Sequence, residues 1–355
     1  MENKFSSGVL EDLRSDEEKL KDHKAEELFS AAPSLNWPTW DEWKNAPENQ
    51  KMLNDIQVSS QDGSSSCLAQ ATAGALAVDN MNEEGKFRRM SARSIYPFRA
   101  NKPGLGMNFD DAGRLATKRG VLFEDLAPSQ EYGEDKMNDT SDFLPSFEQI
   151  AKIYRAKNYL WLPNNIDWVA GIADRKKSVV LGVRFGNGGE WPVEVPQITN
   201  ATPVNGHGIF TLPKAYFIYN GKKSVLIQDS WGVNTGMAGR RILTEDWFGA
   251  RMMAAIYFEN LANLEAANGS MPKPTYRFTV VMRPGQRSED IAMMQRCLGY
   301  LQDSQGYLFP LDTPPTGLYG GITRAGVKRF QALQGVPVTG ECDIITIGEL
   351  NKIFS

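Results

Sequence analysis

Residues 59–81 read SSQDGSSSCLAQATAGALAVDNM, a loop of small polar residues that runs directly into an Ala-rich helical segment. Cys67 stands at the junction, where the helix is predicted to begin. The positive end of a helix dipole and its unpaired N–H groups favour the thiolate, which is the reactive form of cysteine. Cys67 is therefore a candidate nucleophile, although a lone cysteine is more often a small buried hydrophobic residue.

The other parts of a cysteine-based site lie far along the chain. A thiol nucleophile needs a basic partner, and the chain contains only two histidines, His23 and His207. His23 lies among charges typical of a solvated helix face, so His207 is the candidate. Asp229, in the motif QDSWG, is the candidate that orients the histidine. Gln61, six residues before the cysteine, is a candidate donor to an oxyanion, together with the cysteine N–H.

The pattern around these residues changes from helical to strand-like. Helices are predicted at 67–81, 91–99, 110–119 and 147–157. Strands are predicted in SVVLGVRF, GIFTLP, AYFIYNGKKSVLIQDSW and MMAAIYF, with Asn220-Gly221 as a hairpin turn. Helices first and strands second predict an α+β fold, in which a helical half faces a β half.

The motifs, taken in order, resemble those of the papain-like cysteine peptidases. Gln61, then Cys67 at a helix start, then His207, then the Asp229-Ser230-Trp231-Gly232 motif on a late strand all match the family pattern. The resemblance covers roughly residues 35–260. It implies a papain-like two-lobed fold, with a helical lobe and a β lobe, and peptide-bond hydrolysis through a Cys-His-Asp site.

The same resemblance implies three substrate-binding residues. Trp231 would cover the contact between the histidine and the aspartate from water, although it can also be a core aromatic residue. A glycine-containing strand edge lies along the substrate in the family. Gly104 and Gly106 are the candidates for that edge here.

Three residues depart from the family pattern. Leu68 replaces the usual tryptophan after the nucleophile, which is expected to alter the leaving-group side of the cleft. Ser64 replaces a cysteine that forms half of a disulfide in the family, and this fits a chain not built for an oxidising compartment. Asp229 replaces an asparagine, a tolerable change because a carboxylate orients imidazole as well as an amide does.

The last segment resembles the small three-helix peptidoglycan-binding domain found beside many wall hydrolases. The matching stretches, within 283–354, are RPGQRSEDIAMMQRCLGYL, TGLYGGITRAGVKRFQ and GVPVTGECDIITIGEL. The resemblance implies binding to peptidoglycan, with docking of a protein as the alternative. Cys297 and Cys342 both lie in predicted helical parts of this domain, and a disulfide between them is left open.

These segments predict four regions along the 355 residues. They are a charged arm at 1–34, a papain-like peptidase domain at 35–262, a linker at 263–276 and an all-α peptidoglycan-binding-like domain at 277–355. The linker is predicted from NLEAANGSMPKP, which is rich in Asn, Ala, Gly and Pro.

Composition argues against several other classes. Residues 1–34 carry all of the net charge of −4, so no basic field is available for nucleic acid. No apolar run reaches the roughly 18–20 residues of a membrane span. The first residues lack the apolar core of a secretory signal. Two histidines and three cysteines without suitable spacing predict no metal site, and no cofactor is expected.

The predicted function is a cysteine endopeptidase tethered to the bacterial cell wall, acting on a peptide or protein substrate. If the substrate is the peptidoglycan stem peptide, the chain is a lytic enzyme such as a phage-encoded or virion-associated endolysin. If it is a protein, the chain is a processing or competitor-directed protease. Without a signal peptide, the wall or envelope would be reached after release or by non-classical export. The alternative class is a non-catalytic wall-binding or structural protein that retains the peptidase fold.

Overall fold

The computed structural model describes residues 8–28, 33–186, 189–259, 273–304, 306–309 and 315–355. The chain forms two compact units, one made of Met1–Ser141 and Ala151–Leu264, the other of Asp142–Ile150 and Glu265–Ser355. Parts of the predicted arm, at 1–7 and 29–32, and most of the predicted linker, at 263–272, lie outside the described residues. The four regions and their boundaries therefore stay predictions.

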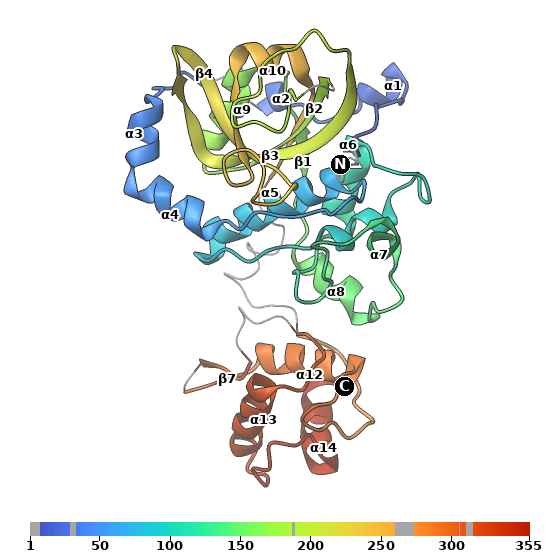
Figure 1. Cartoon of the computed structure of the whole chain (residues 1–355). Helices are drawn as coiled ribbons and strands as arrows, with labels where there is room; N and C mark the ends of the chain where they lie inside the picture. Colours follow the sequence, from blue (N-terminus) through green and yellow to red (C-terminus); the bar gives the residue numbers. More distant parts are fainter. Residues whose placement is uncertain (1–7, 29–32, 187–188, 260–272, 305, 310–314) are drawn as a thin grey trace. The chain divides into compact units, whose positions relative to one another are not determined.

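Within the described part of the first unit, an antiparallel sheet of six strands forms the β half (Figure 1). The strands lie in the order β1-β6-β2-β3-β4-β5. Their bounds are β1 Tyr159–Trp161, β2 Val179–Gly186, β3 Pro203–Tyr219, β4 Lys222–Gln228, β5 Arg240–Thr244 and β6 Met252–Phe258. The β3–β4 hairpin turns at Asn220-Gly221, where both residues have positive φ as a type I′ turn requires.

Each face of the sheet packs against helices. Alternate strand residues enter two different apolar cores, so that Val180 and Ile256 join α5 (Cys67–Glu84), whereas Leu181 and Ala255 join α9 (Ile166–Asp174). Helix α10 (Glu245–Arg251) packs in the same core as α9. The predicted α+β fold, with a helical part and a β part, is confirmed.

Helix α5 lies so close to β3 that two glycines are required between them. A Cβ atom built on Gly74 would be 2.4 Å from the Phe210 ring. A Cβ built on Gly208 would be 2.6 Å from the Cα of Leu68. This close approach places the strand residue before Gly208 beside the first turn of α5.

Two helices predicted from the sequence are shorter or irregular. Residues 91–99 form two 3₁₀ turns, η1 (Ala92–Ser94) and η2 (Tyr96–Phe98), because Pro97 cannot donate a helical hydrogen bond and restricts the residue before it. Residues 110–119 form α6 (Phe109–Arg114), which continues as the π-helical turn η3 (Leu115–Arg119). The helix predicted at 147–157 is α8 (Ser146–Ile153).

The remaining helices of the first unit are short. They are α1 Asp16–Lys19, α2 Ala25–Leu28, α3 Trp40–Asn45, α4 Pro47–Asp55 and α7 Glu134–Asn138. Helix α1 begins with a capping box between Ser15 and Glu18. Helix α3 packs against β3 through Trp40, whose ring centroid lies 4.6 Å from that of Phe217.

The second unit has a core of its own, built largely from three helices. These are α12 Glu289–Tyr300, α13 Gly321–Leu333 and α14 Ile344–Phe354, with a two-stranded hairpin of β7 Gln302–Asp303 and β8 Gly306–Tyr307. Of residues 278–282, only Met282 pairs in strand fashion, through a single bridge with Cys342. Cys297 and Cys342 are buried free thiols, and no disulfide joins them.

Candidate active site

Cys67 is the first residue of α5 and is completely buried. The loop before it is held by its own serines, since the hydroxyls of Ser64 and Ser66 lie 2.7 Å apart and the Ser64 hydroxyl also donates to the Gln61 carbonyl oxygen at 2.8 Å. The structure therefore places the thiol at the start of a long helix, in a loop with little freedom to move.

His207 lies on β3, one residue before Gly208, and is also fully buried. Its Nε2–H donates to Oδ1 of Asp229 at 2.7 Å. Nδ1 makes no hydrogen bond with any described group. The ring is enclosed by aromatic side chains, with the ring centroid of Trp231 at 4.9 Å and that of Trp191 at 5.6 Å. With Nε2 engaged, Nδ1 is the nitrogen left for chemistry.

The surroundings of His207 favour its charged form. Burial by itself lowers the pKa of this imidazole, but the charge of Asp229, its hydrogen bond to the ring and the nearby Cys67 thiol outweigh burial and raise the pKa from 6.5 to about 9. A Cβ atom built on Gly208, the residue after His207, would be 3.0 Å from the carbonyl carbon of Cys67, so the cysteine and the histidine, 140 residues apart in the chain, lie together in the fold.

Asp229 follows β4 and is buried. Its Oδ1 accepts from His207 and from the Ser230 N–H at 2.6 Å. Its Oδ2 accepts from Nε1–H of Trp191 at 2.9 Å and from the guanidinium of Arg241. Burial alone would raise the pKa of this carboxyl, but the charges of His207 and Arg241 hold it below its usual value of 3.8. The carboxylate is therefore the ionised form in the site.

Two of these contacts were not anticipated from the sequence. Trp191 lies in the stretch GGEWPVEVP, which resembles a surface loop, and Arg241 is the second of two adjacent arginines at the start of β5. For the two arginines, strand alternation is the one sequence signal, because it places the Arg241 side chain on the face of β5 opposite to that of Arg240.

Gln61 links the loop before Cys67 to the QDSWG segment. Its Oε1 accepts from the Ser230 hydroxyl at 2.6 Å, and its backbone N–H donates to the Ser230 carbonyl oxygen at 2.9 Å. Its Nε2 donates to the Ser64 carbonyl oxygen at 2.6 Å. The structure thus brings Gln61 into the same region as the other three predicted site residues.

The N-terminal segment passes directly over this region. The N–H groups of Gly8 and Val9 both donate to the Gly206 carbonyl oxygen, at 3.0 and 3.3 Å. On the other side, the Met107 N–H donates to the Gly8 carbonyl oxygen at 2.8 Å, and the Leu10 N–H donates back to Met107 at 3.1 Å. The segment is therefore held by backbone pairing on both sides, with Cys67 underneath.

This segment is not the fully exposed arm that its charges suggest. Gly8 and Val9 are buried, and the Val9 side chain lies 3.6 Å from a Cβ built on Gly182. Further along, the Arg14 guanidinium forms ion pairs with three carboxylates, those of Asp12, Asp22 and Asp110. These contacts hold residues 8–22 on the first unit.

Of the two glycines predicted to lie along a substrate, Gly106 lies beside the N-terminal segment and Gly104 does not. A Cβ atom on Gly106 would be 2.6 Å from the Gly8 carbonyl oxygen, so Gly106 borders the covered groove. Gly104 lies in an exposed turn, where its N–H donates to the Asn101 carbonyl oxygen at 2.7 Å and its own carbonyl accepts from Arg99. Trp231, the third predicted residue, lies against His207 as described above.

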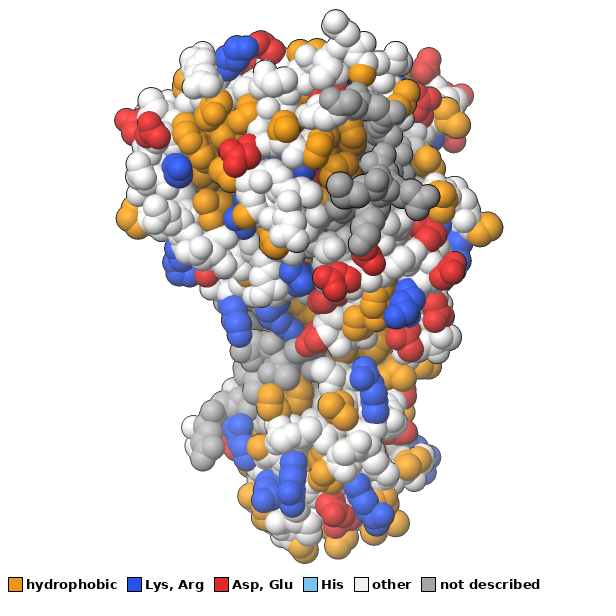
Figure 2. Space-filling model, viewed as in Figure 1, with side chains coloured by type: hydrophobic (Ala, Val, Ile, Leu, Met, Phe, Trp, Pro, Cys, Tyr) orange, Lys and Arg blue, Asp and Glu red, His pale blue; other side chains and the backbone are white. Residues whose placement is uncertain are grey.

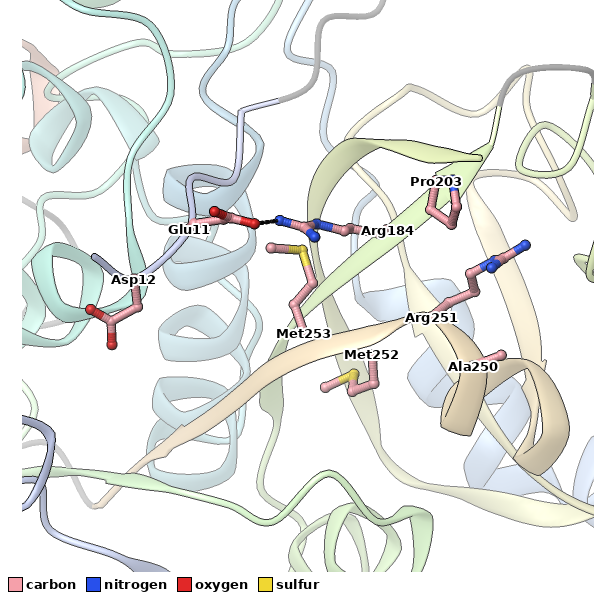
Figure 3. A pocket seen from close by; sticks show the side chains of 8 residues that line it. All are labelled: Glu11, Asp12, Arg184, Pro203, Ala250, Arg251, Met252 and Met253. Atoms are coloured by element: carbon pink, nitrogen blue, oxygen red, sulfur yellow. Dashed lines mark hydrogen bonds and ion pairs between the residues drawn. The ribbon is translucent and has the colours of Figure 1, made fainter. Parts of the chain in front are cut away.

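A hollow of about 530 Å³ opens beside the N-terminal segment (Figure 3). Arg184 of β2 reaches across it and pairs with Glu11 of the segment. The full lining comprises Glu11, Asp12, Arg184, Pro203, Ala250, Arg251, Met252 and Met253.

Neither a metal site nor a membrane span is evident in the part of the chain that the structure describes. No group of three or more His, Cys, Asp or Glu side chains there is arranged to hold a metal ion. No described helix combines the length and the apolar character needed to cross a membrane.

The fold and the matched domain define the class of protein. The first unit has the papain-like cysteine protease fold, and residues 287–350 match the family described as "Putative peptidoglycan binding domain". One solved structure similar to this chain is xylellain, a cysteine protease from Xylella fastidiosa, with 18% identity and a TM-score of 0.56 over 73% of this chain and 97% of that chain.

A second similar structure is procathepsin B S9 from Trypanosoma congolense, with 12% identity and a TM-score of 0.50 over 73% of this chain and 86% of that chain. A comparison with curated protein sequences found no match. The similarity to solved structures establishes the fold, and the activity is a separate question.

Proposed function

We propose that the chain is a cysteine peptidase that its C-terminal unit holds on bacterial peptidoglycan. The observation that carries the proposal is the buried cluster at the start of α5. There Asp229 accepts a hydrogen bond from His207, and both Asp229 and the Cys67 thiol raise the pKa of that imidazole. Its charges fit a nucleophilic thiolate paired with an imidazolium.

In the proposed reaction, the Sγ of Cys67 attacks the carbonyl carbon of the scissile peptide bond. His207 delivers its Nδ1 proton to the leaving amine, and the C–N bond breaks to leave an acyl-cysteine. The neutral Nδ1 then takes a proton from water, whose oxygen attacks the acyl group and releases the thiolate. Asp229 holds Nε2–H throughout. Gln61 and the Cys67 N–H are the proposed donors to the oxyanion.

The groove now filled by residues 8–10 is the proposed site for the substrate backbone. The Gly206 carbonyl oxygen and the Met107 N–H, which pair with the segment, are groups that any extended peptide can use. Gly106 leaves room for such a backbone, and Trp231 shields the histidine from water. Because the segment covers Cys67, hydrolysis requires the segment to leave the groove.

Once the segment has left, Arg184 offers a positive charge beside the groove. This favours substrates that carry a carboxylate in the position of Glu11, and the carboxylate-bearing stem peptides of peptidoglycan fit that requirement. The proposed enzyme is a lytic one, for example of phage type, that acts at the bacterial wall or envelope. A protease that processes an envelope protein is the competing form.

The C-terminal unit is proposed to bind the wall. Its surface mixes basic and apolar side chains (Figure 2), and the exposed apolar ones include Ile322, Val338 and Ile344. Binding to an insoluble polymer raises the effective concentration of the substrate without any new contact at Cys67.

The proposal is tested by zymography on whole bacterial walls beside a casein-type protein substrate. Three full-length proteins are compared: the unaltered chain, Gly8→Ala to displace the segment, and Cys67→Ala. We expect Gly8→Ala to clear the walls, the unaltered chain to clear them more slowly, and Cys67→Ala to be inactive. Clearing of casein alone would favour the processing protease. Equal activity in the Cys67→Ala protein, or no activity in any of the three, would contradict the proposal.

A further inference from the structure

The carboxylate of Asp229 is surrounded by hydrogen-bond donors. Oδ1 accepts from the ring N–H of His207 and the backbone N–H of Ser230, and Oδ2 accepts from the indole N–H of Trp191 and the guanidinium of Arg241. An amide has an NH₂ group in place of one oxygen, and in either orientation that group would face two donors. The pocket is therefore built for a carboxylate, although an asparagine would orient the imidazole equally well in isolation.

Arg241 is the only one of these donors that carries a permanent charge. Its side chain is completely buried, and its Nε–H donates to the Trp191 carbonyl oxygen at 2.6 Å. The guanidinium carbon lies 4.8 Å from the centroid of the Trp191 ring. These two contacts with Trp191 hold the Arg241 side chain in one rotamer, with its guanidinium beside Oδ2 of Asp229.

We propose that Arg241 is a positioning residue of the site: it neutralises Asp229 and turns the carboxylate so that Oδ1 faces His207. The Asp229–Arg241 pair, which has no net charge, then accepts the Nε2–H hydrogen bond of His207 as a neutral asparagine would. The catalytic meaning of this assignment rests on the proposed function, but the pairing itself does not.

The electrostatic consequence follows from the groups around His207. The titratable or charged groups that act on the ring are Cys67 from α5 and Asp229 after β4, with Arg241 of β5 acting on Asp229. Glu190 and Arg251, which lie nearby, are paired with each other. Removing the positive charge of Arg241 raises the pH at which the buried His207–Asp229 pair loses its proton, because the deprotonated pair would leave an unpaired carboxylate. Removing the negative charge of Asp229 lowers that pH.

The test uses NMR titration of the histidine rings in the full chain. The chain has only two histidines, and exposed His23 serves as an internal reference. All variants carry Cys67→Ala, which removes the second titrating partner and any self-cleavage. We expect Arg241→Met to raise the apparent pKa of His207 by about one unit or more, and Arg241→Lys to raise it by less.

Arg240→Met is the matched control. Arg240 is the neighbouring residue on β5 and is partly buried, but it donates to the carbonyl oxygens of Leu53 and Ile56 and not to Asp229. We expect it to leave the His207 pKa unchanged. A His207 pKa that does not move in Arg241→Met, or that moves equally in Arg240→Met, would overturn the assignment.

A second measurement covers the case in which Arg241→Met does not fold. Asp229→Asn leaves the Arg241 charge buried without a partner, whereas Asp229→Asn with Arg241→Met carries no charge at this point. We expect the double variant to unfold at a higher urea concentration than Asp229→Asn, and to have a higher His207 pKa. A double variant no more stable than Asp229→Asn would refute the pairing.

The two proposals fail in different ways. The His207 titration needs no substrate, so a protein that shows the expected shifts but cleaves no peptide contradicts the peptidase function and leaves the Arg241 assignment standing. If the protein hydrolyses peptides but its His207 pKa does not respond to Arg241→Met, the Arg241 assignment is contradicted and the peptidase function stands.

Discussion

Gly8 lies directly over Cys67, so close that a Cβ atom on Gly8 would be 3.0 Å from the cysteine Sγ and 2.0 Å from the Ser65 carbonyl oxygen. Only a residue without a side chain fits at this point. The backbone of the segment pairs with the chain on both sides of the thiol, so the covered state is an ordered arrangement with its own hydrogen bonds. This relationship makes the accessibility of Cys67 a direct measure of where the N-terminal segment lies.

Gly8→Ala should uncover the thiol. Overpacking of this kind costs about 1–3 kcal/mol, which corresponds to roughly a 5- to 150-fold shift toward the displaced segment. The rate of alkylation of Cys67 by iodoacetamide, followed by mass spectrometry, should rise by about that factor. Gly249→Ala is the control, because a Cβ there meets nothing within 4 Å. Equal rates in the two variants would show that the segment does not limit access.

Alkylation should also discriminate among the three cysteines. Burial raises the pKa of both Cys297 and Cys342 to about 12, so almost none of either thiol is ionised at neutral pH. In folded Gly8→Ala at pH 7, iodoacetamide should modify Cys67 well before the other two, and all three should react after unfolding in urea. Equal labelling of the three cysteines in the folded protein would remove the case for Cys67 as nucleophile.

The stability of the first unit should fall as pH rises from about 6.5 to about 9. The pKa of His207 is about 9 in the folded chain against 6.5 normally, so the folded state holds a proton that the unfolded state releases. This contribution, at most about 3 kcal/mol, is complete below pH 6.5 and is lost as the pH passes through 9. Urea unfolding at a series of pH values measures it. His207→Gln should flatten the slope and His23→Gln should not; the same slope in both variants would argue against the charged histidine.

The C-terminal unit should carry the affinity for cell walls. A chain ending at residue 264 should lose binding to insoluble peptidoglycan in a pelleting assay, and it should keep its rate on a short soluble peptide when both chains carry Gly8→Ala. The full-length protein with Cys67→Ala should still pellet, because the thiol plays no part in binding. Pelleting of the shortened chain at the same level would assign wall binding to the first unit instead.

Much of the fold was predictable because it depends on local patterns. The apolar positions of 291–298 repeat at helical spacing and lie in α12, and the Asn220-Gly221 pair makes the hairpin turn that those residues prefer. The helix expected at 91–99 is wrong, because Pro97 breaks the helical hydrogen-bond pattern and the segment forms two 3₁₀ turns.

The sequence by itself determined the α+β fold class and the start of a helix at Cys67. It also singled out His207 as the candidate basic partner of that cysteine. Each of these depends on residue type, spacing or count. Tertiary structure alone decided that Gly8 covers the thiol and that Arg241 and Trp191 share the carboxylate of Asp229. These contacts join segments with no periodic relation to one another, and they form only because the close packing of α5 on β3 and the register of β4 with β5 bring distant backbones together.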